Sequence, residues 1–140
     1  MAKIGWVSGS GRGMKMKVGN TGAIVAGNMV TVDGAGNQYI MAAAAAETQI
    51  IGVAGEAVAA PTADGDVEVF VYTDRNDRFR QDVITGTIAA TDVNRVCDSA
   101  VAGIDVSASA VDNIQIVEVD VANAQAIVII DFNAGSAGVV

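Results

Sequence analysis

Residues 114–132 read IQIVEVDVANAQAIVIIDF, and this stretch decides the fold class. Its two ends, Ile114–Asp120 and Ala126–Phe132, are short runs rich in Val and Ile, whose branched side chains pack well on a pleated sheet. The linker Val121–Gln125 between them has the length of a tight connection between neighbouring strands. The stretch therefore predicts an antiparallel pair of strands.

Similar short β-branched runs, separated by turn residues, occur throughout the chain. Residues 28–41 predict a hairpin, because the turn sequence DGAGN (33–37) lies between Met29–Val32 and Tyr39–Met41. Further strands are expected at 50–54, 67–72, 83–88, 95–97 and 104–106, a loop at Pro61–Asp66, and a connector or one helical turn at Ala42–Ala46. Turn signals spaced about eight to twelve residues apart are typical of a β-sandwich or small barrel. We predict an all-β protein, a small β-sandwich or β-barrel-like domain of short antiparallel strands.

The charges are distributed unevenly along the chain. Residues 1–32 carry +4 and no acid, whereas residues 33–140 carry four Arg against sixteen acids, or −12. The first segment is also rich in glycine, so we expect residues 1–26 to be a flexible basic arm on a β-rich body at 27–140. Opposite charges would steer such an arm onto a partner surface. On this hypothesis, deletion of 1–26 leaves a folded body that attaches more weakly.

Two features are candidate partner contacts. A lone Trp6 in a glycine-rich segment has little core of its own to enter, and Trp is a favoured interface anchor. The charged window 74–82 is open to two interpretations, a solvated turn or an interface at a seam between two small lobes. Phe79 within it favours the interface, since a solvated loop does not need it. The predicted partner-binding residues are Lys3, Trp6, Arg12, Lys15, Lys17, Arg75, Arg78, Phe79 and Arg80.

The residue inventory gives little support to an enzyme. The chain has no His, so the commonest general base and metal ligand is missing. Cys97 is predicted to be a buried apolar residue, and SGSGRG (8–13) lacks the ending of a phosphate-binding loop. The turn pairs Asp33/Asn37 and Asp64/Asp66 are weak candidates for a cation. We predict no catalytic residue, no metal and no cofactor.

The net charge of −8 argues against direct nucleic-acid binding. A sugar-binding module is disfavoured, because sugar sites usually display several exposed aromatic side chains and this chain has only six aromatic residues in all. No apolar run is long enough to span a membrane and no secretory signal is evident, so we expect a soluble intracellular product.

The order of features from Gly27 to Tyr72 resembles the head decoration (capsid cement) proteins of tailed bacteriophages. The motifs are GNMV (27–30), VDG (32–34), the Ala run 42–46, IGV (51–53), the Ala-rich loop 57–60 and GDVEV (65–69). They cover about a third of the chain, and Val83–Phe132 matches less well. The resemblance implies a β-rich domain, often a trimer, on the outer surface of the capsid. There it would bridge neighbouring major capsid subunits and stabilise the shell against the pressure of packaged DNA. The alternative is another phage structural part, such as a head fibre, a tail-tube or baseplate component, or a receptor-binding β-domain.

Overall fold

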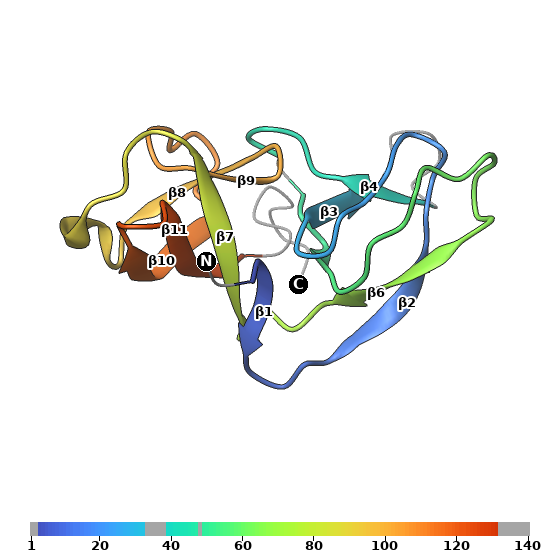
Figure 1. Cartoon of the computed structure of the whole chain (residues 1–140), viewed down its shortest axis with the longest axis horizontal. Helices are drawn as coiled ribbons and strands as arrows, with labels where there is room; N and C mark the ends of the chain where they lie inside the picture. The colour runs from blue at the N-terminus through green and yellow to red at the C-terminus, as the bar shows by residue number, and fades with distance from the viewer. Residues whose placement is uncertain (1–2, 33–38, 48, 132–140) are drawn as a thin grey trace.

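The computed structural model describes residues 3–32, 39–47 and 49–131 (Figure 1). Strands make up 46% of the chain and helix 2%, which confirms the all-β prediction. Two sheets of short, mainly antiparallel strands form a sandwich-like domain. Within the described residues, no helix is long and apolar enough to cross a bilayer, and η1 (Ala90–Asp92) is a single 3-10 turn.

The first sheet has five strands in the order β2-β6-β5-β3-β4. They are β2 (Gly13–Lys17), β6 (Glu68–Tyr72), β5 (Gly52–Ala54), β3 (Met29–Val32) and β4 (Ile40–Ala42). A parallel bridge between Val18, just after β2, and Ile40 brings the two ends of this sheet together. The sheet therefore curls toward a barrel.

The second sheet has six strands in the order β1-β7-β11-β10-β8-β9. They are β1 (Gly5–Ser8), β7 (Arg78–Thr85), β11 (Gln125–Ile130), β10 (Ile114–Asp120), β8 (Val96–Ala100) and β9 (Gly103–Asp105). The long strand β7 pairs with β1 and β11 through its first half and with β9, in parallel, through its second half. This sheet thus closes on itself, with β1 added outside the ring.

Buried side chains form two clusters. One lies within the first sheet and includes Val18, Ile24 and Val71. The other is shared, because Met29 and Val53 of the first sheet pack with residues of the second sheet such as Phe79. The shared core makes the two sheets one packed body.

Most of the predicted strands are confirmed. β10 and β11 pair antiparallel from Ile114↔Ile130 to Asp120↔Gln125, and β3 pairs with β4 as the predicted hairpin, whose turn at 33–37 lies outside the described residues. The loop at 61–66 is confirmed. The alanine run is a connector whose end, Ala46, has φ of 51°. The strand expected at 83–88 begins earlier, at Arg78.

The predicted flexible arm is wrong within the described part of residues 1–26. β1 pairs with β7, and β2 pairs with β6 over five residues, Gly13↔Tyr72 to Lys17↔Glu68. Val18 and Ile24 are fully buried in the first sheet. The segment supplies an edge strand to each sheet, so its deletion would remove structure rather than release a tail.

Candidate interaction surface

The crossover between the two sheets is where the N-terminal segment is anchored. Strand β6 of the first sheet ends at Tyr72, and strand β7 of the second sheet begins at Arg78. The chain therefore passes from one sheet to the other in the turn 74–77. Window 74–82 covers this turn and the first part of β7, and the shared core joins the two sheets on either side of it.

Asp77 is the buried acceptor of this anchor. It is 1% exposed, and its carboxylate accepts hydrogen bonds from Trp6 Nε1 (3.0 Å), Ser10 N (2.7 Å) and Gly11 N (2.9 Å). Charge-assisted bonds of this kind are about twice as strong as neutral ones. Asp77 therefore ties the loop between β1 and β2 to the crossover. Sequence reasoning missed this role, because the donors lie more than sixty residues away in the chain.

A second carboxylate, that of Asp74, also binds the loop between β1 and β2 at this turn. Asp74 accepts bonds from Asn76 N and from the Ser10 hydroxyl. These two bonds, in that order, hold the pKa of Asp74 below its usual value, and the nearby Arg12 guanidinium contributes. Arg12 and the 74–77 turn, which the sequence placed in separate candidate sites, thus lie together.

The nine predicted partner-binding residues fall into four groups, of which Arg80 is the last. Six cations are exposed, namely Lys3, Arg12, Lys15, Lys17, Arg75 and Arg78. Trp6 is 40% exposed but packs on its own domain, stacked on Tyr72 and bonded to Asp77. Phe79 is wrong as a contact residue, since it is fully buried in the shared core.

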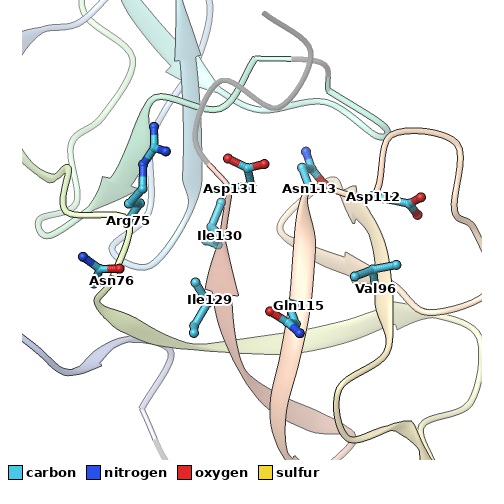
Figure 2. A pocket seen from close by; sticks show the side chains of 9 residues that line it. All are labelled: Arg75, Asn76, Val96, Asp112, Asn113, Gln115, Ile129, Ile130 and Asp131. Carbon is cyan, nitrogen blue, oxygen red and sulfur yellow. The ribbon is translucent and has the colours of Figure 1, made fainter. Parts of the chain in front are cut away.

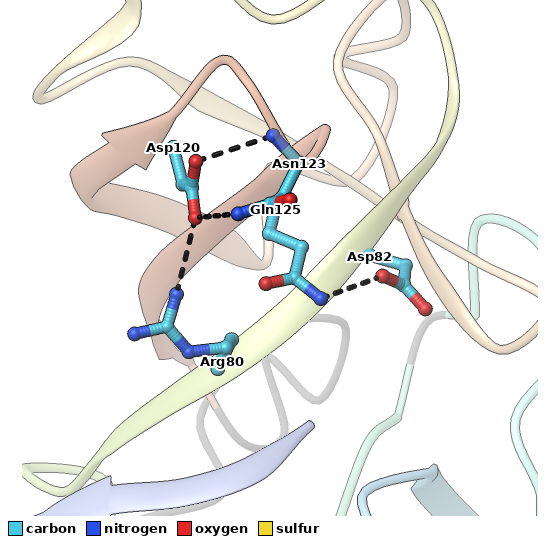
Figure 3. A network of polar contacts seen from close by, with 5 residues as sticks. All are labelled: Arg80, Asp82, Asp120, Asn123 and Gln125. Atoms are coloured by element: carbon cyan, nitrogen blue, oxygen red, sulfur yellow. Dashed lines mark hydrogen bonds and ion pairs between the residues drawn. The ribbon is translucent and has the colours of Figure 1, made fainter. Parts of the chain in front are cut away.

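Arg80 is half-buried and engaged within the domain (Figure 3). Its Nη1 lies 3.9 Å from Asp120 Oδ2, and Asn123 also bonds to Asp120. The bonds from Asn123 and the charge of Arg80 lower the pKa of Asp120. Figure 3 also shows Gln125 donating to Asp82 across the β7–β11 pair. This network braces the sheet and leaves Arg80 a poor contact for a partner.

The edge of β2 that faces away from β6 is open along the first part of the strand. At the two ends of this pairing Thr73 N donates to Arg12 O, and Val18 N donates to Val67 O, both at 3.0 Å. Because antiparallel residues alternate between bonded and non-bonded pairs, Met14 and Met16 complete the ladder to β6. Gly13, Lys15 and Lys17 direct their backbone N–H and C=O groups to the other side. At the Lys17 end, that side is closed by the parallel bridge between Val18 and Ile40 of β4, where Gly19 N donates to Ile40 O at 3.0 Å. Beside Gly13 and Lys15, no strand of the described residues pairs with it.

A cavity of about 340 Å³ lies at the ends of β8, β10 and β11 (Figure 2). Its lining combines one cation, two carboxylates, three amides and three apolar side chains: Arg75, Asp112, Asp131, Asn76, Asn113, Gln115, Val96, Ile129 and Ile130. Asn113 is already bonded to Ser99 and to the backbone of Glu47. The cavity is a polar recess without a nucleophilic side chain among these lining residues.

Two further predictions concern reactive groups. Cys97 is fully buried as predicted, and burial raises the pKa of its thiol to about 12. Among the described residues, no three His, Cys, Asp or Glu side chains come together as metal ligands. Asp33 and Asn37 lie outside the described residues, whereas Asp64 bonds to Asn20 N and Asp66 to the Thr62 hydroxyl.

The sequence matches no protein-family model and no curated protein. The function of this chain is therefore inferred from its own residues and from the resemblance described above.

Proposed function

We propose that this chain is a structural virion protein that decorates the outer surface of a phage capsid. It bridges neighbouring major capsid subunits and stabilises the shell against internal DNA pressure. It acts as a homo-oligomer, with a trimer the expected form, and has no catalytic site or direct nucleic-acid contact. The proposal is supported by the resemblance over residues 27–72 and by a β-domain that presents an open strand edge.

The open edge of β2 is the observation that carries the proposal. An exposed edge strand is a template for an added strand from another chain, unless the protein blocks it. Lys15 and Lys17 stand on this strand and are exposed, and two β2 strands placed side by side would set like charges against each other. The preferred occupant is therefore an extended segment of the major capsid protein, not a second copy of β2.

Lys15→Pro tests this edge without disturbing the ladder to β6. Because the Lys15 N–H points away from β6, proline at this position removes a donor beside which no strand of the described residues pairs. The matched control, Lys15→Ala, removes the same charge and the same ion pair with Glu56 but keeps the N–H. We expect both variants to fold, and Lys15→Pro to bind mature capsids much more weakly than Lys15→Ala.

The assay is co-sedimentation with mature capsids of the virus that encodes the chain, with copy number measured by quantitative mass spectrometry. Hundreds of wild-type copies per shell support decoration. A handful of copies indicates a fibre, portal or tail part, and none at all contradicts a virion role. Equal binding of the Pro and Ala variants contradicts the edge as the contact, even where the copy number supports decoration.

A further inference from the structure

The outer face of β6 carries a line of aromatic side chains. Phe70 and Tyr72 alternate with the buried valines, and Trp6 of β1 lies next to Tyr72. The Trp6 and Tyr72 rings are stacked with centroids 6.0 Å apart, and Phe70 meets Tyr72 edge-on at 5.0 Å. Half of the six aromatic residues of the chain thus form one group, here called the aromatic stripe.

The stripe is open to solvent. Trp6 is 40% exposed, and Phe70 and Tyr72 are half-buried. The cross-strand neighbour of Tyr72 is Gly13, and a Cβ on Gly55 would lie 3.0 Å from Phe70 and 3.1 Å from Tyr72. Glycines at these two positions keep side chains off the rings.

Packing against the hydrophobic core accounts for Tyr72 in the stripe but not for Phe70. Tyr72 packs against the shared core and contacts Phe79 at 6.1 Å. Phe70 packs against neither core. A half-buried aromatic ring with no core to cover is a marker of binding, because aromatic rings offer large contact areas to a ligand.

A hollow of about 180 Å³ adjoins the Trp6 end of the stripe. Trp6 and Tyr72 line it together with Gly5, Gly27, Gly55 and Lys3. The Tyr72 hydroxyl has no hydrogen bond to any described residue. The hollow therefore pairs ring surfaces with polar groups that are available to a ligand.

The charges around the stripe balance one another, because the cations Arg12, Lys15 and Lys17 each lie beside a carboxylate. Lys15 Nζ lies 2.8 Å from Glu56 Oε2, and that carboxylate also accepts from Phe70 N. These bonds, with Lys15 first, hold the pKa of Glu56 below its usual value. Lys17 is paired in register with Glu68, and Arg12 lies near Asp74. Single-stranded nucleic acid needs aromatic rings in a groove of net positive charge, and this face lacks that excess.

The small number of aromatic residues disfavoured a sugar-binding module, but the fold brings three of them together on one face. We infer that the aromatic stripe binds a neutral glycan chain. The C–H face of a sugar ring stacks on Trp6, Tyr72 or Phe70, and its hydroxyls bond to Glu56, Lys15 and the Tyr72 hydroxyl. A carboxylate and an ammonium held 2.8 Å apart offer an acceptor and donors to neighbouring hydroxyls. This site is separate from the β2 edge, because a strand added at the edge lies in the plane of the sheet.

Fluorescence of Trp6 gives a direct test, because it is the one Trp of the chain. The probes are maltohexaose, cellohexaose and chitohexaose N-acetylated on every unit, titrated separately into the full chain in 0.15 M salt. We expect a saturable change in Trp6 emission with at least one probe, and a Kd that stays constant between 0.05 and 0.5 M salt. Oligo-dT is titrated in the same way, to test whether the stripe binds a polyanion instead of a neutral glycan.

Phe70→Leu removes the ring but keeps an apolar side chain, and we expect its Kd to rise about tenfold, which corresponds to about 1.4 kcal/mol. Tyr72→Phe, which lacks the hydroxyl, should also weaken binding. The control is Val101→Ala, in the β8–β9 turn of the other sheet. The inference is overturned by no saturable change with any neutral glycan, by unchanged binding in Phe70→Leu, or by salt-dependent binding of oligo-dT alone.

Discussion

The bonds to Asp77 predict a large effect from one substitution. Asp77→Ala removes the acceptor of Trp6 Nε1, Ser10 N and Gly11 N at once. Each hydrogen bond to a charged group contributes about 1.5–3 kcal/mol, which gives an upper sum near 5–9 kcal/mol. Ser10 is exposed and regains water after the substitution, so the net loss is smaller. We expect about 3 kcal/mol, or a Tm lower by roughly 10 °C for a domain of this size.

Urea unfolding of the variant, followed by Trp6 emission, measures this loss. Native emission should also shift to the red, because the indole loses its bond to Asp77 and gains water. Asp77→Asn, which keeps one oxygen but presents an N–H₂ to the donors, should lose a smaller part of the stability. Asp66→Ala is the control, since this exposed carboxylate accepts a bond from the Thr62 hydroxyl in a surface loop, and we expect a change within about 0.5 kcal/mol. A loss below about 1 kcal/mol for Asp77→Ala would refute the anchor, because three such bonds cannot contribute so little together.

Four other outcomes follow from the same structure. Deletion of residues 1–26 should give a chain that fails to fold, shown by loss of cooperative unfolding, because β1, β2, Val18 and Ile24 are removed. Burial tends to raise the pKa of Asp98, but bonds from the backbone N–H groups of residues 110–112 outweigh it and lower the pKa. Asp98 should therefore add stability above the unfolded pKa of about 3.9 that is lost as pH falls through the lower folded value, and Asp98→Asn should flatten this acid dependence of urea unfolding. Cys97 should resist a thiol reagent at pH 8 in the native protein and react fully in urea, since its pKa is about 12 and its side chain is buried. Because the sheets share a core, Trp6 emission and Cys97 reactivity should report one unfolding midpoint, and two separate midpoints would indicate independent lobes.

Local signals in the sequence were enough to predict the strands. The β3–β4 and β10–β11 pairs are hairpins whose strands and turns are neighbours in the chain, so pattern and turn chemistry decide them. The alternation of β6 also predicted the faces correctly, with Val69 and Val71 buried. Such short-range pairings depend on few residues, and those residues are visible together.

The errors arose where the fold depends on distant partners. β1 and β2 are rich in glycine and charge and look like an arm, yet each strand is completed by a partner more than fifty residues away. A signal for Phe79 was present, since residues 77–81 alternate, with Asp77, Phe79 and Gln81 buried. The Arg residues at 78 and 80 made this strand look like a solvated cluster. Local composition cannot report that a buried carboxylate has found its donors elsewhere in the chain.

The position of the basic segment links the fold to the proposed role. If the segment were a free arm, a pull on it would extend the arm and leave the body unaffected. Instead, β2 is hydrogen-bonded to β6, and β6 continues through the Asp77 anchor into β7. β7 in turn pairs with three strands of the second sheet, and both sheets meet in one core. A load applied at the β2 edge is therefore shared by the whole domain, which is what a clamp between capsid subunits requires and a flexible tether does not provide.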